Sequence, residues 1–337
     1  MATEILIFRT DSIGELIVTC PVIITIKKYF NNSRITIITS NKNYEYAKSL
    51  DIFDKIHQFP NNNIINKIKF MYKLSKKKFD YIFIFDGKDR SIFSASLIKS
   101  NYKVAVRDEK KISIINKLFN IKFVKNSNKS NVHDIFQELL NYCKINTNIK
   151  NYDFLKIKKN NNFLLKIPIK NYLHIHLDEK WFKNLYIDSY SDINPSYNDF
   201  VDFVKNLALK SNVLITTGII DFDLIQNLKI KFFQKKTDNI YLKNYSNTSV
   251  YFIYMPTFND IESLLRNAKI LITCHGAVTH VANSFNVKIV DIIEENRKVF
   301  YQHYTSYLKK YNPIYTNKFN LLKKIYLIFV KPNYFAG

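Results

Sequence analysis

Short apolar runs alternate with amphipathic stretches along most of the chain. In the first half, runs typical of buried parallel strands occur at Glu4–Phe8, Arg34–Thr39, Lys55–Phe59, Tyr81–Phe85 and Lys103–Val106. Apolar residues at helical spacing occupy the stretches between them, at Leu16–Phe30, Asn43–Leu50, Ile64–Lys77 and Ser91–Lys99. This order predicts a parallel sheet covered by helices on both faces.

The pattern fades across Lys144–Lys170, where Asn and Lys dominate, and then returns. Further strand-like runs occur at Tyr172–Leu177, Asn212–Thr217, Val250–Ile253, Lys269–Thr273 and Lys288–Ile292. Helical patterns cover Tyr197–Leu209, Asp221–Phe232, Phe258–Asn267, Val278–Phe285 and Leu321–Phe329. We therefore predict an α/β chain of two doubly wound domains, residues 1–165 and 166–337, with a late helix over 317–330 that packs back on the first domain. Because ligands bind at the carboxyl ends of such strands, we expect the active site in the cleft between the domains.

The composition fits two globular domains. It also gives the chain a large positive charge. Hydrophobic residues make up 47% of the 337, and 51 Lys and Arg stand against 28 Asp and Glu, for a net charge of +23. That charge points to a polyanionic partner such as nucleic acid, an anionic membrane face or a phosphorylated substrate. The abundance of Asn, Lys, Ile, Tyr and Phe is also typical of an AT-rich coding bias, which would explain the charge without a partner.

Several classes of protein are disfavoured. The three cysteines, Cys20, Cys143 and Cys274, are widely spaced and form no CxxC motif, which supports neither a zinc site nor a disulfide framework. No apolar stretch reaches the roughly 18 residues of a membrane span, and the opening lacks the pattern of a signal peptide. We expect a cytoplasmic protein whose membrane contact is at most peripheral.

The first candidate for chemistry is the loop Arg9–Glu15, which leaves the first strand and opens the first helix. Helix amides near Ser12 and Gly14 could hold an anion, and either Asp11 or Glu15 could act as a general base. The alternative is a helix N-cap with acids in the first turn. The loop matches neither the GxxxxGK[ST] nor the GxGxxG phosphate-binding motif, which disfavours a simple ATPase or dehydrogenase.

A second candidate, Cys274–His280, follows a strand and enters a helix. Gly276 and Ala277 would let a phosphate approach the helix amides, with Thr279 in the same turn. His275 and His280 could donate hydrogen bonds to phosphate or ribose. The alternatives are a helix start with one packed histidine, or a metal site, for which two histidines without a carboxylate are a poor set.

A third candidate is His174–Trp181, at the end of another strand. His174 and His176 share one face of this strand, and Lys180 just beyond it suits a diphosphate. Trp181 either packs against a nucleotide base or belongs to the core. Gly218, which follows the next strand, joins this set as a donor-binding residue.

The opening of the chain, Ile5–Pro21 (ILIFRTDSIGELIVTCP), closely resembles that of glycosyltransferase family 9, the ADP-heptose:lipopolysaccharide heptosyltransferases. That family opens with an apolar strand, a basic residue, the motif T/S-x-S-x-G-D and an apolar helix containing a proline. The similarity is detailed over the opening segment, and later landmarks follow in the right order. It implies a GT-B fold of two facing Rossmann-like domains, with a nucleotide-sugar bound mainly by the second domain, and an inverting, metal-independent transfer.

The resemblance also implies roles for single residues. Glu15 falls on the acid that closes the family's S-x-G-D motif, an Asp proposed as the base. Asp178–Trp181 falls on a D-D-K-x-W-like segment, which makes Lys180 the diphosphate contact. In the D-[ST]-G-P-x-H-L-A signature, His280 falls on the histidine, while His275 replaces the Asp.

These observations predict a glycosyltransferase that needs no cofactor besides its nucleotide-sugar donor, for which the resemblance suggests an ADP-linked sugar. A heptose or a hexose would pass to an anionic glycan or glycolipid acceptor of the lipopolysaccharide type, contacted by Arg9. The basic stretch Lys67–Lys78 suits docking at the cytoplasmic face of the inner membrane, or is simply a solvated helix face. The alternatives are a non-catalytic sugar-nucleotide-binding protein and a nucleic-acid-binding protein, although the chain shows no RRM, helix-turn-helix or zinc-finger signature.

Overall fold

The computed structural model describes residues 2–60, 63–108, 120–126, 131–150, 152–157, 167–182, 185 and 194–316. The chain forms two compact units, Met1–Lys158 with Gln302–Tyr307, and Lys159–Tyr301 with Leu308–Gly337. The predicted domain boundary at 165/166 and the predicted helix over 317–330 both lie outside the described residues. They therefore remain predictions.

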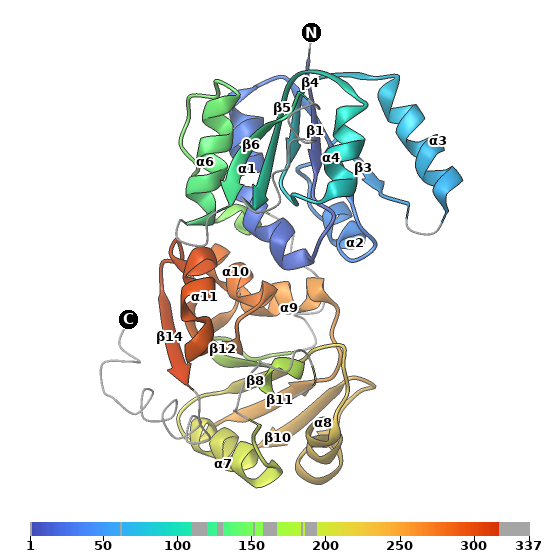
Figure 1. Cartoon of the computed structure of the whole chain (residues 1–337). Helices are drawn as coiled ribbons and strands as arrows, with labels where there is room; N and C mark the ends of the chain where they lie inside the picture. Colours follow the sequence, from blue (N-terminus) through green and yellow to red (C-terminus); the bar gives the residue numbers. More distant parts are fainter. Residues whose placement is uncertain are drawn as a thin grey trace. The chain divides into compact units, whose positions relative to one another are not determined.

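The first unit contains a six-stranded, entirely parallel sheet in the order β3-β2-β1-β4-β5-β6 (Figure 1). Its strands are β1 (Thr3–Phe8), β2 (Ser33–Thr39), β3 (Lys55–Gln58), β4 (Lys78–Ile84), β5 (Lys99–Asp108) and β6 (Lys122–Asn126). Its helices are α1 (Ile13–Tyr29), α2 (Tyr44–Lys48), α3 (Ile64–Ser75), α4 (Asp89–Ser96) and α6 (Val132–Tyr142), with a 3-10 turn η2 (Phe154–Ile157). The five strands and four helices predicted for this half are confirmed.

Strand β1 lies at the centre of this sheet, between β2 and β4. Its last four residues, Ile5 to Phe8, are completely buried because helices cover both faces, with α1 and α6 on one side and α3 and α4 on the other (Figure 1). A strand that is buried on both faces consists of a continuous run of apolar residues, which explains why β1 could be predicted from the sequence. Its carboxyl end places the loop Arg9–Glu15 at the edge where ligands bind in such sheets.

The second unit contains an eight-stranded sheet in the order β14-β13-β12-β7-β8-β11-β10-β9. Its strands are β7 (Tyr172–Leu177), β8 (Val213–Thr217), β9 (Gln234–Lys235), β10 (Ile240–Asn244), β11 (Ser249–Ile253), β12 (Ala268–Cys274), β13 (Lys288–Glu294) and β14 (Tyr311–Thr316). Its helical segments are η4 (Glu179–Trp181), α7 (Tyr197–Ala208), α8 (Asp223–Asn227), η5 (Leu228–Phe232), α9 (Phe258–Leu265), α10 (Ala277–Ser284) and η6 (Glu295–Arg297). The residues of α11 (Lys298–Thr305) are divided between the two units.

One edge of this second sheet departs from the predicted parallel arrangement. Strand β10 pairs antiparallel with both β11 and β9, whereas the other pairs are parallel. The turn between β10 and β11 is closed by a hydrogen bond from the Tyr245 amide to the Thr248 carbonyl, at 2.9 Å. So short a connection can join only antiparallel neighbours, because a parallel pair needs a crossover of a dozen residues or more.

Within the described ranges, no helix combines the length and apolar character that crossing a bilayer requires.

Candidate functional site

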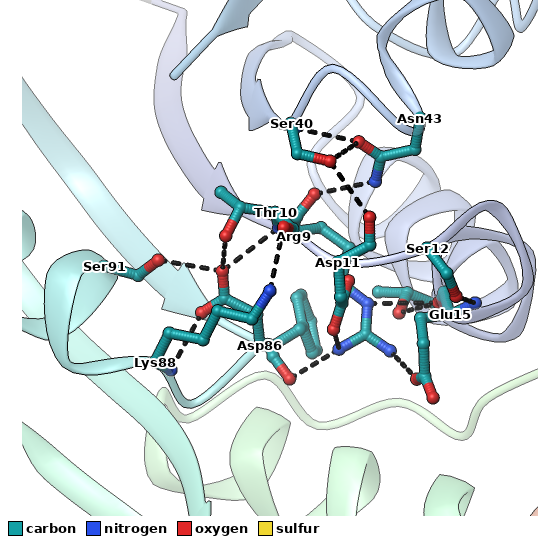
Figure 2. Close-up of polar contacts among 12 residues, drawn as sticks. Arg9, Thr10, Asp11, Ser12, Glu15, Ser40, Asn43, Asp86, Lys88 and Ser91 are labelled. Carbon is teal, nitrogen blue, oxygen red and sulfur yellow. Dashed lines mark hydrogen bonds and ion pairs between the residues drawn. The ribbon is translucent and has the colours of Figure 1, made fainter. Parts of the chain in front are cut away.

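In the first unit, Arg9 organises the loop that follows β1 (Figure 2). Its side chain is nearly fully buried and donates hydrogen bonds to the Phe85 carbonyl at 2.6 Å and the Glu15 carbonyl at 3.1 Å. The guanidinium also pairs with the Glu15 carboxylate and lies 3.4 Å from the Asp11 carboxylate. These contacts make Arg9 a residue that positions two acids, and the predicted contact with an acceptor stays a prediction.

Asp11 combines burial with an unsatisfied oxygen. Its side chain is 22% exposed, and its Oδ1 atom is buried with no hydrogen-bond partner in the described part of the chain. Burial raises the pKa of Asp11 to about 6; the charges of Glu15 and Asp86 act in the same direction and Arg9 opposes them. A carboxylate with a pKa near neutrality is well suited to accept a proton at physiological pH.

Glu15 lies in the first turn of α1, as the helix-cap alternative predicts, and its role as a base stays a prediction. Ser12 is the N-cap residue, and its hydroxyl accepts a hydrogen bond from the Glu15 amide at 3.4 Å. The Glu15 side chain is 32% exposed and is held by Arg9. The helix-cap alternative is thus confirmed for Ser12, and Gly14 lies beside these residues in the same turn. Capping does not exclude a chemical role for the carboxylate.

A third acid, Asp86, ties this loop to the end of β4 and was not singled out by the sequence. Its Oδ2 accepts hydrogen bonds from the Thr10 amide at 3.0 Å, the Thr10 hydroxyl at 2.6 Å and the Ser91 hydroxyl at 2.8 Å. The Lys88 amide donates to its Oδ1 at 3.2 Å, as Figure 2 shows in the same cluster. An acid directly after the apolar run YIFIF was the signal in the sequence that could have indicated this role.

Tyr304 joins this cluster from a distant part of the sequence, in the segment Gln302–Tyr307 that belongs to the first unit. Burial, followed by the negative charge of Glu15, raises its pKa, and Arg9 and Asp11 also act on it. No pattern in the sequence links this residue to the loop after β1, because only folding brings them together.

In the second unit, the loops after β8 and β12 pack tightly against the segment Asp178–Lys180, which follows β7. The Lys180 ammonium pairs with Asp178 at 2.6 Å, and although burial opposes ionisation, the charge of Asp178 keeps the pKa of Lys180 above its usual value. A Cβ atom on Gly276 would lie only 2.6 Å from the Lys180 ammonium. A Cβ on Gly218 would lie 2.9 Å from the Glu179 carboxylate. The structure therefore brings three predicted residues together, Lys180, Gly218 and Gly276, and both glycines leave room for these side chains.

The two histidines of β7 share one hydroxyl partner. His176 Nδ1 lies 3.0 Å and His174 Nε2 lies 2.8 Å from the Thr216 hydroxyl on the neighbouring strand. Burial lowers the pKa of His176 to about 4 and that of His174 well below its usual value. Both rings are therefore neutral at physiological pH, so His176 would offer a ligand a hydrogen bond rather than a positive charge.

Trp181, beside them, is completely buried, and its indole donates a hydrogen bond to the His176 carbonyl at 2.8 Å. The core-packing alternative is confirmed for this residue.

His275 is oriented by Asp291, a fully buried acid on β13 that the sequence analysis missed. His275 Nδ1 lies 2.7 Å from Asp291 Oδ2, which also accepts a hydrogen bond from the Tyr311 hydroxyl at 3.0 Å. Because a carboxylate can only accept a hydrogen bond, the proton of this pair lies on Nδ1 of His275. The other ring nitrogen, Nε2, takes no part in this hydrogen bond. The His280 ring stands perpendicular to that of His275, with centroids 5.3 Å apart.

The start of α10 completes this cluster. The helix begins at Ala277, and the Gly276 amide donates to the Thr279 hydroxyl at 3.3 Å. Backbone amides at a helix start, beside a buried lysine and a histidine, form an arrangement that can bind a phosphate group. Among the residues that the structure describes, no group of three or more His, Cys, Asp or Glu side chains could hold a metal ion. Metal-independent chemistry remains a prediction.

Comparisons with known proteins identify the fold. The sequence matches no protein-family model and no curated protein. A glycosyltransferase of family 9 from Veillonella parvula DSM 2008 is structurally similar with a TM-score of 0.66 at 14% identity, over 93% of this chain and 86% of that chain. E. coli heptosyltransferase WaaC with ADP-2-deoxy-2-fluoro heptose has a TM-score of 0.64 at 12% identity, over 96% of this chain and 99% of that chain. UDP-GlcNAc 2-epimerase from Methanocaldococcus jannaschii has a TM-score of 0.57 at 16% identity, over 98% of this chain and 94% of that chain.

At these identities the similarity establishes the fold, and it confirms the predicted α/β fold of the GT-B class. The resemblance found in the opening residues is matched by a structural similarity over nearly the whole chain. Because transferases and an epimerase share this fold, the activity has to be inferred from the site residues.

Proposed function

We propose that the protein is a glycosyltransferase that transfers a sugar from a nucleoside-diphosphate donor to an anionic glycan or glycolipid. The observation that carries this proposal is the close approach of Lys180 to Gly276 at the start of α10. A buried cation beside helix amides offers a diphosphate both charge and hydrogen bonds. Fold analogy to ADP-heptose-using enzymes favours an ADP-linked sugar.

The donor would be held by the second unit. Lys180 and the amides of α10 would bind the diphosphate, with His275 and His280 at the same helix start. The neutral His176 would contribute a hydrogen bond. These groups supply the stabilisation of a leaving diphosphate that a metal ion provides in other enzymes, which supports a metal-independent reaction.

The first unit would bind the acceptor and supply the base. We assign the role of general base to Asp11 rather than to Glu15. Asp11 has a pKa near 6 and an unpartnered oxygen, whereas Glu15 is paired with Arg9. In one displacement, the acceptor oxygen forms a bond to the anomeric carbon as its proton passes to Asp11. The bond from that carbon to the diphosphate breaks, and the electron pair leaves on the diphosphate oxygen. Attack opposite the leaving group inverts the anomeric carbon.

The test of the donor site is calorimetry with ADP, UDP, GDP and CDP. Lys180→Gln should weaken binding of the preferred nucleotide about tenfold or more, because a charged hydrogen bond is worth about 1.5–3 kcal/mol. Lys243→Gln removes an exposed lysine of β10 in the same unit and should leave the affinity unchanged. Equal affinities in both variants would reject the assigned contact.

Product analysis then identifies the reaction. Incubation with a panel of nucleotide-sugars and sugar acceptors should release nucleoside diphosphate together with a glycosylated product. An isomerised nucleotide-sugar would instead assign the protein to the epimerases, and binding without turnover would support the non-catalytic alternative. Either result would overturn the proposed transfer.

We further propose that α3 docks the protein on the cytoplasmic leaflet of the inner membrane. Ile64, Ile68 and Tyr72 are between 62% and 69% exposed on this helix, and lysines lie between them. With Phe93 of α4 and Leu97 directly after this helix, they border an apolar groove of about 560 Å³. Exposed apolar side chains among lysines are typical of helices that lie in an anionic membrane surface.

A further inference from the structure

Five cationic side chains line a pocket of about 420 Å³ in the second unit. None of them was singled out by the sequence, and they come from three separate parts of it: Arg266, Lys269, Lys288, Lys309 and Lys310. The pocket lies where β12, β13 and β14 begin. Because these strands are parallel to one another and to β7, Lys180 and Gly276 lie at the opposite edge of the sheet, beyond the carboxyl ends of β7 and β12. The pocket is therefore separate from the proposed donor site.

Pairing of the strands holds three of these lysines together. Lys288 opens β13 and pairs with Ile270, the residue after Lys269 on β12. On the other side of β13, the Lys310 carbonyl accepts a hydrogen bond from the Ile289 amide at 2.8 Å. Since neighbouring strands lie only about 4.8 Å apart, the backbone fixes these lysines close to one another.

No acid balances this charge in the wall of the pocket. Among the described residues that line it there is no Asp or Glu, and Lys309 and Lys310 form no ion pair within the described ranges. Burial, followed by the charges of Lys269 and Lys310, lowers the pKa of Lys288. Like charges held together destabilise the folded protein, and a bound anion would relieve that repulsion.

The shape of the pocket and its number of cations limit what this anion can be. A concave pocket of this volume is typical of sites for small molecules, whereas a nucleic acid needs a groove that follows its backbone. One phosphate group carries a charge of only about −1.5 to −2 near neutral pH, so five cations suit a ligand with several phosphate groups. The Arg266 guanidinium, 4.7 Å from the centre of the Phe285 ring, adds a planar donor group that suits two oxygens of one phosphate.

We propose that this basic pocket binds a small anion with several phosphate groups, either an inorganic oligophosphate or the phosphate chain of a nucleotide. Its phosphates lie on Lys269, Lys288 and Lys310 at the strand starts, and Arg266 and Lys309 contact it from the sides of the pocket. The site does not depend on the proposed glycosyl transfer, because it uses none of the residues assigned to the donor or to the base.

Calorimetric titrations with phosphate, tripolyphosphate and ATP at about 0.15 M salt test the pocket. Tripolyphosphate should bind about tenfold or more tightly than phosphate, because it offers more charged oxygens to the same cations. Lys288→Gln/Lys310→Gln should weaken tripolyphosphate binding about tenfold or more. Lys310 is exposed, so the single variant Lys310→Gln keeps the fold and should still lose about three- to fivefold. Comparison of ATP with tripolyphosphate tells whether a nucleoside adds to the affinity.

The matched control is Lys235→Gln/Lys243→Gln, which removes two exposed lysines from β9 and β10 of the same sheet and changes the net charge equally. This control and Lys180→Gln should both bind tripolyphosphate like the wild type. Wild-type affinity in both Lys288→Gln/Lys310→Gln and Lys310→Gln, or an equal loss in the control, would overturn the pocket.

Two further results would also reject this inference. A loss confined to Lys180→Gln would place the anion in the proposed donor site. Tighter binding of single-stranded DNA than of tripolyphosphate would show that the cations bind an extended polyanion rather than a small ligand.

Discussion

Asp11 and Glu15 belong to one short loop and carry the same functional group, yet their surroundings make them different acids. Glu15 is partly exposed and paired with Arg9, whereas Asp11 has a buried, unpartnered oxygen and a raised pKa. The sequence identified both as candidate bases and left the choice open. Burial decides between them, because it disfavours the charged form of a carboxylate.

The pH dependence of transfer should therefore follow Asp11. We expect the rate to rise with pH through a midpoint of about 6, as Asp11 loses its proton and becomes able to accept one. Asp11→Asn should lower the rate about 10²- to 10⁴-fold and abolish this midpoint. Steady-state rates measured from pH 5 to 8 check both points, and an unchanged profile in Asp11→Asn would assign the base elsewhere.

Stability measurements on the same variant separate a catalytic from a structural loss. The unfolded chain ionises Asp11 near pH 4, while the folded protein keeps the proton until about pH 6, so folding stability falls as the pH rises through this window and stays lower above it. Asp11→Asn removes that loss and should stabilise the protein at pH 7.5 by up to about 3 kcal/mol, with no gain at pH 4. Glu138→Gln, which replaces an exposed residue of the same unit, should change the folding stability at neither pH.

The partner that orients His275 could not be predicted from the sequence. The motif around Gly276 indicated that this histidine could bind a ligand. Its orienting partner Asp291 lies on the next strand, within the apolar run KIVDIIE. An acid inside such a run signals a buried partner, but only the pairing of β12 with β13 tells which one.

Helix α3 combines lysines with exposed apolar side chains. Its lysines were predicted to face an anionic membrane or solvent, and the structure adds that Ile64, Ile65 and Ile68 are all more than half exposed. An amphipathic helix in a globular protein would normally bury that apolar stripe. Its exposure, next to the groove shared with α4, favours the membrane over solvent.

Vesicle co-sedimentation tests this helix. The protein should bind vesicles rich in phosphatidylglycerol and not neutral phosphatidylcholine vesicles, and salt should weaken the binding. The double variant Ile64→Ser/Ile68→Ser should bind at least tenfold more weakly, since insertion of one such side chain is worth about 1.5–3 kcal/mol.

The matched control is Leu209→Ser, which removes an apolar side chain of the second unit that is 74% exposed. This variant should bind vesicles like the wild type. If Leu209→Ser lost as much binding as the α3 variant, nonspecific hydrophobicity would explain the association and α3 would have no special role.

The division of the chain into two units does not follow its order. Residues Gln302–Tyr307 belong to the first unit although they follow almost the whole of the second. There the Tyr307 ring lies 4.1 Å from that of His133 on α6 and stacks on Tyr152 with centroids 5.3 Å apart. These aromatic contacts hold the returning segment, which also brings Tyr304 to the Arg9 cluster.

Removing the Tyr307 ring should therefore destabilise the first unit. Tyr307→Ala should lower the free energy of unfolding by about 3 kcal/mol, the usual cost of deleting a packed aromatic side chain. Tyr142→Ala, which removes a tyrosine that is 47% exposed in the same unit, should cost well under about 1 kcal/mol. Urea denaturation followed by circular dichroism measures both, and equal costs would show that Tyr307 does not anchor the segment.

The sequence by itself determined the alternation of strands and helices, because buried parallel strands and amphipathic helices each impose their own spacing of apolar residues. It also located the loops that carry Asp11, Lys180 and His275, since chemistry in α/β folds gathers where strands end. The tertiary structure alone decided which acid has the raised pKa and which carboxylate orients His275. Those properties depend on contacts between residues far apart in the chain, and no local pattern records them.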